Sequence, residues 1–334
     1  MRSASSRSVL AVPAFAKVNV GLEVLGLRDD GYHELRTLFQ TIDLHDEVRV
    51  ALRREPGIEL RCSHPAVPTD GRNLASRAAR DLLRYARVSA GVVLTLVKRI
   101  PVGGGLGGGS SDAAAVLRAL DALLDLRLGA TGLYPLARRL GADVPFFLFG
   151  GTALGLGRGD EIYPLWRQLK AHVVVVDPGH PISTPAVFRR VDASLTPRSN
   201  SYSIYRFVSS DLDGSAAFGV LANDLETAAL EEAPQLRGRF RQIRRILRAG
   251  GACFTRLSGS GSSYFGLFVR ADAARCAERQ LREAGFSVHR SRTLTVDQYR
   301  RAWARSLTGS RHASGTHTGR SGHHGDHGRQ GHSG

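Results

Sequence analysis

The sequence predicts an α+β protein with two domains, and three observations support this prediction. The chain has 334 residues, 42% of them hydrophobic, which is enough for two cores because a domain commonly takes about 150 residues. Strand-like and helix-like patterns are mixed along the first half. A second mixed set of elements begins near Val173 and continues to Leu294. We place the two domains at residues 1–168 and 169–304.

The first fifty residues are predicted to be rich in β-structure. Alternation over Val18–Leu25 is typical of a strand, and Asp29-Asp30-Gly31 is typical of a turn. Asn73 is a suitable N-cap for a helix that ends near Arg87, since apolar residues recur at helical spacing between them.

A run of six glycines follows the next predicted strand, Val92–Ile100. The run lies within Pro101–Asp112, and an apolar helical pattern from Ala113 to Leu124 comes after it. Ser110 or Ser111 is the expected N-cap of that helix. Glycine lets backbone N–H groups close around an anion, and a helix N-terminus adds partial positive charge. The order of strand, loop and helix therefore predicts a phosphate-binding loop.

A further helix is predicted from an N-cap at Thr131 to Leu140, with Gly141 as its left-handed C-terminal residue. Asp143-Val144-Pro145 follows at once and must form an irregular turn. This order places Asp143 just outside a helix.

The second half is predicted to contain both strands and helices, and its last segment is predicted to be a tail. The expected strands are Val173–Val176, Tyr264–Val269 and Phe286–Leu294, and the expected helices are Pro234–Ala249 and Asp272–Ala284. Residues 305–334 are almost free of apolar side chains and hold six of the twelve histidines, so we predict a disordered Gly/His/Ser/Arg tail.

Composition narrows the classes of partner. The formal net charge is +16, but the basic residues are spread along the chain without an arginine–aromatic stripe, so we expect an anionic small molecule and no nucleic acid. Three cysteines without Cys-x-x-Cys spacing indicate neither a disulfide framework nor a zinc site. We therefore expect a protein of the reducing cytoplasm. The longest apolar stretch, Val144–Leu156, is shorter than the roughly 18 residues of a membrane span, so no membrane partner is expected.

Three other interpretations of the glycine run are disfavoured. Gly103, Gly105 and Gly108 match the dinucleotide-binding pattern, but Asp125, about 20 residues on, lies in a helical pattern instead of at a strand end. No Lys-Ser or Lys-Thr pair closes the run, which excludes a Walker A loop. A flexible linker does not explain why a strand and a helix flank the run so closely.

The run from Pro101 to Ser111 resembles the phosphate-binding motif of the GHMP kinases, Pro-x-x-x-Gly-Leu-Gly-Ser/Gly-Ser-Ser. Further segments resemble one branch of that family, which phosphorylates a cytidylated methylerythritol, nearly to Val296. These segments are Ala16–Val20, Leu22–Gly26, Asp30–Leu35, Thr37–Asp43, Leu140–Phe147, Thr184–Phe188, Asn223–Glu226 and Ser258–Gly261. The resemblance implies a two-domain GHMP kinase fold, with ATP-binding and substrate domains and the active site in the interdomain cleft.

The activity that the resemblance implies is transfer of the γ-phosphoryl group of ATP to the 2-hydroxyl of 4-diphosphocytidyl-2-C-methyl-D-erythritol. Asp143 matches the family's general base and Lys17 its catalytic lysine, whose ammonium compensates negative charge. Lys17 is one of only three lysines, with Lys98 and Lys170. We interpret Lys98 as a solvated charge at a strand end. The implied ATP-binding residues are Pro101, Val102, Gly103, Gly104, Gly105, Leu106, Gly107, Gly108, Gly109, Ser110 and Ser111.

The resemblance also implies a site for the cytidine group. Tyr32 and Phe188 match the aromatic pair that sandwiches the base, His33 matches a hydrogen-bonding residue, and Asn19 and Thr184 match further substrate contacts. Mg²⁺ is expected with ATP, but we assign no residue to a metal.

The amino-acid sequence leaves several alternatives open. Ser262 and Ser263 depart from the family's usual second glycine loop. Another GHMP kinase, of the mevalonate, homoserine or sugar type, is the alternative enzyme, and a catalytically silent nucleotide-binding or nucleic-acid-binding protein is the alternative class. The expected assembly is a monomer or a weak homodimer.

Overall fold

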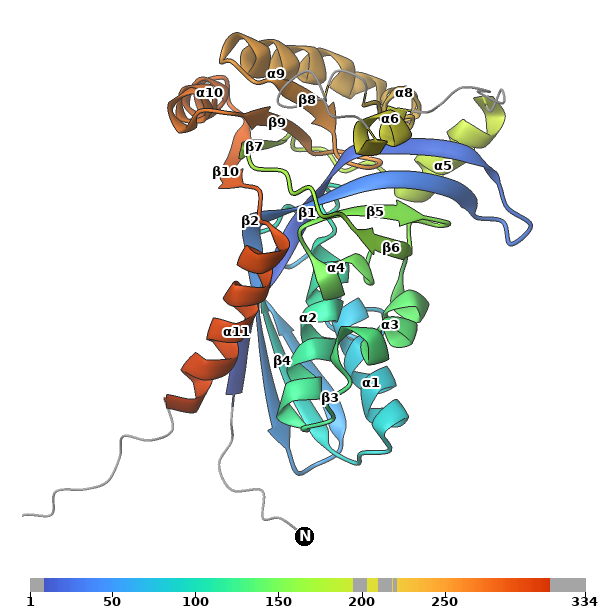
Figure 1. Cartoon of the computed structure of the whole chain (residues 1–334), viewed down its shortest axis with the longest axis vertical. Coiled ribbons are helices and arrows are strands. Elements are labelled where there is room, and N and C mark those ends of the chain that lie inside the picture. Colours follow the sequence, from blue (N-terminus) through green and yellow to red (C-terminus); the bar gives the residue numbers. More distant parts are fainter. Residues whose placement is uncertain (1–8, 195–202, 210–217, 219–220, 313–334) are drawn as a thin grey trace, which may run out of the picture.

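The computed structural model describes residues 9–194, 203–209, 218 and 221–312, and its chain folds around two β-sheets (Figure 1). In the first sheet five strands follow the order β3-β4-β2-β5-β6, and β1 pairs with β2. Its strands are β1 (Val9–Leu27), β2 (His33–Arg53), β3 (Gly57–Cys62), β4 (Gly91–Val97), β5 (Thr152–Leu156) and β6 (Glu161–Pro164). The second sheet has the order β10-β7-β9-β8 and consists of β7 (His172–Asp177), β8 (Phe254–Leu257), β9 (Tyr264–Phe268) and β10 (Ser287–Arg292). The predicted boundary between residues 168 and 169 falls between β6 and β7.

Strands β1 and β2 form a long antiparallel hairpin that connects the two halves of the molecule. In Figure 1 both strands (blue) rise from the lower part of the molecule and pass beneath the elements of the second sheet. Along β1 the buried apolar residues belong in turn to the core of the first sheet, to a central cluster and to the core of the second sheet. They are Leu10, Val12, Ala14 and Phe15 in the first, Ala16, Val18 and Val20 in the central cluster, and Leu22 and Val24 in the last. Lys17 and Asn19 therefore lie where the two halves meet, and the strand register is irregular on either side of them.

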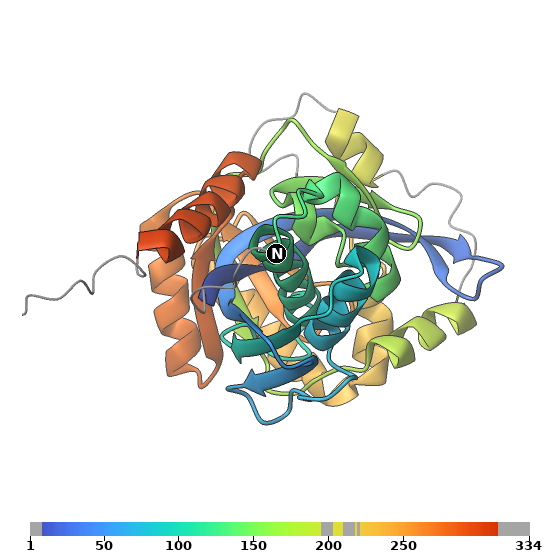
Figure 2. The ribbon, with the colours of Figure 1, turned by 90° about the horizontal axis from the view of Figure 1, so that it is seen from below.

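Helices α1 (Leu74–Ala86), α2 (Gly108–Leu123) and α3 (Gly129–Leu140) pack together beside the first sheet, and the short helix α4 (Phe146–Phe149) contacts α2 and α3. Figure 2 shows these helices (cyan to green) gathered beside the blue strands. The predicted cap of α1 is confirmed, because the Asn73 side chain accepts a hydrogen bond from the Ala75 N–H at 2.8 Å. Alanine and leucine on the buried faces of α1 and α2 allow the close packing.

Three predicted helix ends are wrong. Helix α2 begins at Gly108 after a left-handed Gly107 without a side-chain cap, so neither Ser110 nor Ser111 is its N-cap. Helix α3 begins before Thr131, because the Asp121 carboxylate accepts from the backbone N–H groups of residues 128 and 129 and replaces a local cap. Gly141 has φ 170°, which is extended, because the chain passes directly into the turn before α4.

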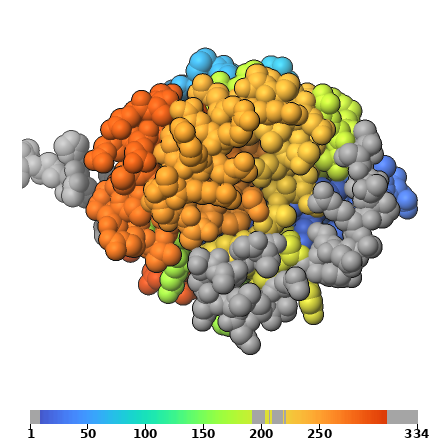
Figure 3. All heavy atoms as spheres, turned by 90° about the horizontal axis from the view of Figure 1, so that it is seen from above, coloured from blue at the N-terminus to red at the C-terminus, as the bar shows by residue number. Residues whose placement is uncertain are grey.

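The remaining helices lie around the second sheet and supply the upper face of the molecule. They are α5 (Thr184–Ser194), α6 (Ser203–Ser209), α8 (Leu225–Glu232), the 3-10 helix η1 (Pro234–Leu236), α9 (Arg237–Ala249) and α10 (Ala271–Glu283). Seen from above, atoms of the segment from α8 to α10 (gold to orange) cover most of this face (Figure 3). The predicted strands and helices of this half are confirmed as β7, β9, β10, α9 and α10. The elements α5, α6, α8 and β8 were not predicted, and neither were β3, α4, β5, β6 and α11 (Val296–His312).

The last helix, α11 (Val296–His312), returns to the first sheet and contacts β1. Figure 1 shows it (red) beside the N-terminal end of β1. Tyr299 and Trp303 are buried there, and the guanidinium carbon of Arg118 lies 3.8 Å from the Trp303 ring centroid. The helix runs past Arg305, where the sequence predicts the tail to begin. Residues 313–334, which hold the rest of that predicted tail, lie outside the described residues.

Candidate active site

The glycine run forms the loop between β4 and the first residues of α2. Gly103, Gly105 and Gly107 have φ values of 74°, 74° and 72°, a left-handed conformation that other residues rarely adopt. Gly105 also lacks room for a side chain, since a Cβ there would lie 2.2 Å from the Ser258 carbonyl oxygen. The loop is thus shaped by glycine both in its conformation and in its closeness to the segment Ser258–Gly261.

A second glycine-containing loop, Ser258–Ser263, supports the first one. The Ser258 hydroxyl donates to the Gly105 carbonyl at 3.0 Å, and the Ser263 N–H donates to the Gly104 carbonyl at 3.1 Å. Asn223 fixes the second loop by donating to the Gly259 carbonyl at 2.8 Å and to the carbonyl of Leu257, just before the loop, at 3.0 Å. Segments more than 100 residues apart in the sequence therefore hold the first loop in place.

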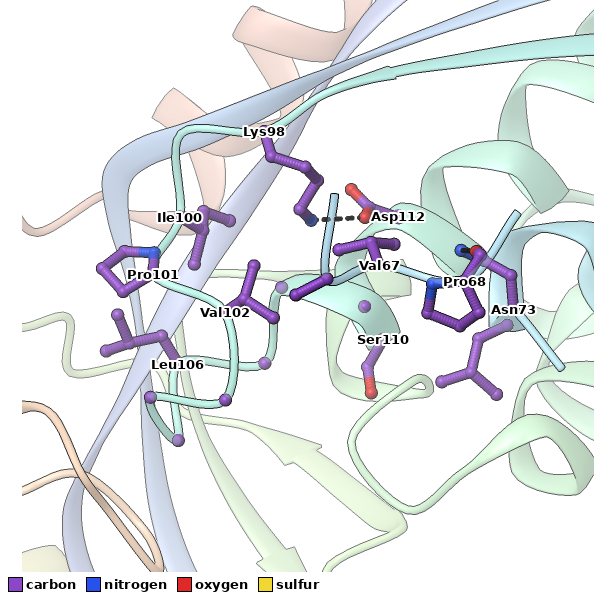
Figure 4. A pocket seen from close by; sticks show the side chains of 18 of the residues that line it. Val67, Pro68, Asn73, Lys98, Ile100, Pro101, Val102, Leu106, Ser110 and Asp112 are labelled. Atoms are coloured by element: carbon purple, nitrogen blue, oxygen red, sulfur yellow. Dashed lines mark hydrogen bonds and ion pairs between the residues drawn. The ribbon is translucent and has the colours of Figure 1, made fainter. Parts of the chain in front are cut away.

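A cavity of about 370 Å³ lies over the first loop (Figure 4). One side consists of the loop backbone and Ser110, and the other side is formed mainly by apolar side chains from the segment before α1. These apolar residues include Val67 and Pro68, and Leu74, the first residue of α1, continues the wall. Backbone N–H groups suit phosphates and an apolar wall suits a nucleobase, so the cavity has the parts of a nucleotide site. We refer to it as the nucleotide pocket.

Lys98 lies beside this pocket and is buried between two carboxylates, so its interpretation as a solvated charge is wrong. Its Nζ bonds Asp46 on β2 and lies 2.6 Å from Asp112 Oδ2 on α2, as Figure 4 shows for Asp112. Asp46 also accepts from the backbone N–H groups of Arg99 and Ile100. The three side chains therefore tie both ends of the glycine loop to the sheet.

Burial raises the pKa of the Asp112 carboxyl to about 7, and Lys98 offsets only part of the rise while Asp46 adds to it. Burial alone would lower the pKa of Lys98, but the two carboxylates outweigh it and raise this pKa. Oδ1 of Asp112 has no hydrogen-bond partner among the described residues. The network therefore keeps a cation next to the loop, together with a carboxyl group that titrates near neutral pH.

A second cavity, of about 610 Å³, meets the nucleotide pocket at Gly105, Gly107 and Ser110, which line both. It extends along β2, where His33, Leu35, Thr37 and Phe39 alternate along one face of the strand. The opposite side comes from α5 and the second glycine loop. We refer to this cavity as the acceptor pocket.

Lys17 and Asp143 lie at the end of the acceptor pocket that is next to the glycine loop. Lys17 Nζ is 3.3 Å from Asp143 Oδ2 and donates to Asn19 Oδ1 at 2.6 Å. The Lys17 backbone N–H also donates to the Leu106 carbonyl at 2.9 Å, which fixes the lysine to the loop. The Lys17 side chain is 4% exposed and that of Asp143 is 34% exposed, so the carboxylate remains accessible from the cavity.

Hydrogen bonds continue from Lys17 along the floor of the pocket. Asn19 Nδ2 donates to Thr37 Oγ1 at 2.8 Å, and the Thr37 hydroxyl donates to the Gly21 carbonyl at 2.9 Å. Both Asn19 and Thr37 are buried and need such partners. The chain of bonds fixes the rotamer of Asn19 and, through it, the position of the Lys17 ammonium.

The other end of the acceptor pocket is aromatic. Tyr32 is exposed in the turn before β2, His33 is the first residue of β2, and Phe188 lies on α5. The ring centroids of His33 and Phe188 are 4.9 Å apart. Thr184, also on α5, shares a 2.6 Å hydrogen bond with Ser260 of the second glycine loop. This end offers both ring faces and polar groups.

The structure brings the predicted site residues together in these two pockets. Lys17 and Asp143 line the acceptor pocket with all the predicted substrate contacts, namely Asn19, Tyr32, His33, Thr184 and Phe188. The predicted ATP-binding residues Pro101 to Ser110 line the nucleotide pocket. Ser111 is buried within α2 and lines neither pocket.

Several pocket residues were not predicted from the sequence. The apolar wall at residues 66–68 comes from a loop without a recognisable motif, and Arg158 reaches the acceptor pocket only through the tertiary fold. Asp112 directly follows the serine pair, which is the one sequence signal that pointed toward it. Among the described residues, no group of three or more His, Cys, Asp or Glu side chains is arranged to hold a metal ion.

Comparison with known proteins defines the class of this protein. The chain matches the family profiles "GHMP kinases N terminal domain" over residues 73–151 and "GHMP kinases C terminal" over residues 216–286, and it is an ATP-dependent small-molecule kinase of this class. A 4-diphosphocytidyl-2-C-methyl-D-erythritol kinase of Chlorobium luteolum is 42% identical over 81% of this chain and 93% of its own length, and one of Geobacter sulfurreducens is 41% identical over 85% and 99%. The chain belongs to the family of 4-diphosphocytidyl-2-C-methyl-D-erythritol kinases.

Solved structures agree with the two-domain GHMP kinase fold. A crystal structure of 4-(cytidine 5'-diphospho)-2C-methyl-D-erythritol kinase has 40% sequence identity and a TM-score of 0.69, covering 85% of this chain and 99% of that one. A homoserine kinase from Cytophaga hutchinsonii has the same TM-score at 20% identity, covering 88% and 97%, so this second likeness concerns the fold alone. In the described part of the chain, no helix is both long and apolar enough to cross a membrane.

Proposed function

We propose that this protein transfers the γ-phosphoryl group of ATP to the 2-hydroxyl of 4-diphosphocytidyl-2-C-methyl-D-erythritol, in the non-mevalonate route to isoprenoid precursors. One observation carries the proposal: the acceptor pocket has a Lys–Asp pair at the end that meets the nucleotide pocket and aromatic rings at its other end. An acceptor with an alcohol at one end and a nucleobase at the other matches this arrangement. The names of the relatives support the same substrate.

In this proposal Asp143 is the general base. Its carboxylate accepts the proton of the 2-hydroxyl while the alcohol oxygen forms a bond to the γ-phosphorus and the bond from that phosphorus to the bridging oxygen of ADP breaks. Lys17 stabilises negative charge on the transferring group, since its ammonium lies 3.3 Å from the carboxylate and next to the loop. The products are ADP and the 2-phosphorylated acceptor.

The glycine loop binds the phosphates of ATP. Its backbone N–H groups and the N-terminus of α2 supply partial positive charge, and Lys98 holds both ends of the loop through Asp46 and Asp112. Mg²⁺ neutralises charge across the β- and γ-phosphates when ATP is bound. An Mg²⁺ ion that binds together with ATP takes most of its ligands from phosphate and water. It therefore does not need a group of three or more protein ligands, which the described residues lack, and we assign it to no side chain.

The aromatic end binds the cytidine group. Tyr32 and Phe188 offer ring faces for stacking on the base, and His33 offers a ring nitrogen to its polar edge. Asn19 and Thr184 provide amide and hydroxyl groups to the rest of the substrate. We expect the enzyme to work in the cytoplasm as a monomer or weak homodimer. Its three cysteines are free, which is compatible with a reducing compartment.

A panel of alcohols tests the proposal against another GHMP kinase activity. ATP and Mg²⁺ are supplied with the cytidylated methylerythritol, mevalonate, homoserine or galactose, and ADP release is measured. We expect only the cytidylated alcohol to support rapid turnover, with the phosphorus NMR signal of a new tertiary phosphate ester. Faster turnover of any other alcohol would reject the proposed substrate.

A further inference from the structure

Arg158 lies in the turn between β5 and β6, beside the middle of the acceptor pocket. The backbone N–H of Leu35 donates to the Gly157 carbonyl at 2.6 Å, and a Cβ at Gly159 would lie 3.8 Å from Thr37. The turn therefore runs along β2 between the positions of Leu35 and Thr37. Arg158 itself lines the pocket.

Residues of β2 line the acceptor pocket from its aromatic end to its reacting end, so the β2 residue beside Arg158 tells how far the arginine lies from each end. His33, at the aromatic end, is six residues from Phe39, whose ring centroid lies 5.5 Å from Lys17 Nζ. Six strand residues span about 20 Å. In the proposed substrate a diphosphate lies between the cytidine and the reacting alcohol, so its two negative charges fall between these ends, at the level of Arg158.

Arg158 is held in place by its neighbours. Its Nη2 lies 2.9 Å from Asp160 Oδ2, and its guanidinium carbon lies 4.9 Å from the Tyr32 ring centroid. Asp160 is 1% exposed and also accepts a 2.9 Å hydrogen bond from Arg138. Burial alone would raise the pKa of Asp160, but the two guanidinium groups lower it, so the carboxylate is ionised. Asp160 carries one negative charge and two guanidinium groups share it. The positive charge of Arg158 is therefore only partly compensated, so its guanidinium can bind a further anion.

The other cations of the pocket are less suited to the diphosphate. Lys17 is engaged by Asp143 and Asn19 at the reacting end. Arg189 is exposed on α5, so water and salt screen its charge. Asp30 lies near enough to Arg158 for the arginine to lower the pKa of this carboxyl slightly, but the backbone N–H of Tyr32 is the main cause of that shift.

We infer that Arg158 binds the diphosphate of the acceptor substrate and so selects acceptors that carry one. The guanidinium donates to phosphate oxygens from the side of the pocket while its stacking on Tyr32 fixes its direction. This inference rests on the proposed function, because it concerns the same substrate.

CDP and cytidine serve as probes, measured as competitive inhibitors against the cytidylated methylerythritol. For Arg158→Gln we expect the inhibition constant of CDP to rise about tenfold or more, that of cytidine to change less than threefold, and the KM for ATP to stay the same. Arg158→Lys keeps the charge and should recover part of the CDP affinity. Equal weakening of CDP and cytidine would overturn the inference, because it would mean that Arg158 acts only by ordering Tyr32.

Arg61→Gln is the matched control. It makes the same change at an exposed arginine of β3 that lines neither pocket and does not contact Asp160, so CDP should bind this variant as it binds the unmodified protein. A loss of CDP affinity in Arg61→Gln as large as in Arg158→Gln would also overturn the inference. Failure of the proposed function has a different signature: the unmodified protein would then neither turn over the cytidylated alcohol nor bind CDP.

Discussion

At the scale of single residues, the reacting end of the acceptor pocket depends on how Lys17 is held. Its ammonium has Asn19 and Asp143 as partners, and its backbone N–H is bonded to the glycine loop. A buried ammonium is stable only with such compensation. The same contacts that satisfy the lysine therefore place it between the nucleotide loop and the proposed base.

Asp143→Asn tests the base assignment. The amide cannot accept the proton, so kcat should fall by about 10²- to 10⁴-fold while the KM for ATP stays within about threefold. Asp125→Asn is the control, because Asp125 is an exposed carboxylate at the far end of α2 that lines neither pocket. Turnover of Asp143→Asn near that of Asp125→Asn would refute the role of Asp143.

Asp112 makes stability depend on pH. Its pKa is raised by burial from the ordinary value of a carboxyl to about 7, so the folded protein binds this proton more tightly than the unfolded chain. The proton on Asp112 therefore stabilises the folded state. This contribution is complete below about pH 4, where the carboxyl is protonated in both states, and it is lost as the pH rises to about 7. Asp112→Asn cannot ionise and lacks this contribution.

Urea unfolding of the unmodified protein and of Asp112→Asn between pH 5 and pH 8 measures the effect. We expect the stability of the unmodified protein to fall relative to the variant as the pH rises to 7, by at most about 1.4 kcal/mol per pH unit, and the difference to level off above pH 7. Parallel pH profiles would show that Asp112 does not titrate in this range.

At the scale of elements, the two glycine loops form one unit. The first loop has left-handed glycines, and the second presses its backbone against Gly105 so closely that no side chain fits. Ser262 and Ser263, which depart from the usual family pattern, are buried in this contact. Ser263 contributes its backbone N–H to it, so the departure leaves the contact between the loops intact.

Gly105→Ala should destabilise the protein, because a Cβ would meet the Ser258 carbonyl and the residue has a positive φ. We expect a loss of several degrees in Tm together with weaker ATP binding. Gly109→Ala is the control, since a Cβ at this helical position meets nothing within 4 Å. Its Tm should stay the same or rise slightly, and equal losses in both variants would contradict the role given to the loop contact.

The sequence predicted some of these elements better than others, for physical reasons. Periodicity and capping residues are local signals, so the helix that begins after Asn73 and the strands β7, β9 and β10 of the second sheet were found, whereas the short strand β8 was missed. The starts of α2 and α3 were missed because their first turns are set by a left-handed Gly107 and by the Asp121 carboxylate of the preceding helix, where no N-cap pattern applies. The burial of Lys98 depends on Asp46, more than fifty residues away.

Site residues, too, were predicted where a local sequence motif marks them and missed where only long-range packing places them. Lys17, Asp143 and the glycine loop lie in segments that carry a motif, and the fold brings them to one junction. Arg158 and the apolar wall before α1 carry no motif, and only the pairing of β2 with β5 and the packing of α1 reveal them.

At the scale of the whole molecule, the fold joins distant parts of the chain around the site. Helix α11 packs on β1 and also supports the segment after Asp143, because the Tyr299 hydroxyl donates to the Phe147 carbonyl. The hairpin of β1 and β2 passes through all three apolar clusters. Stability of the site and of the whole fold are therefore linked.

Trp303→Ala tests the contribution of α11. Trp303 is 2% exposed in the core of the first sheet, so its removal should cost about 3–5 kcal/mol of unfolding free energy. The chain contains one other tryptophan, Trp166, which is 92% exposed. Trp166→Ala should change stability by less than about 0.5 kcal/mol. Similar unfolding curves for the two variants would contradict the packing of α11.

The most direct test of the central claim compares two acceptors that differ only in the cytidine diphosphate group. ADP release is measured with 4-diphosphocytidyl-2-C-methyl-D-erythritol and with 2-C-methyl-D-erythritol at equal concentrations. We expect kcat/KM to be at least about 100-fold higher for the cytidylated alcohol, because the aromatic end of the pocket and Arg158 then contribute to binding. Equal values of kcat/KM would contradict the account.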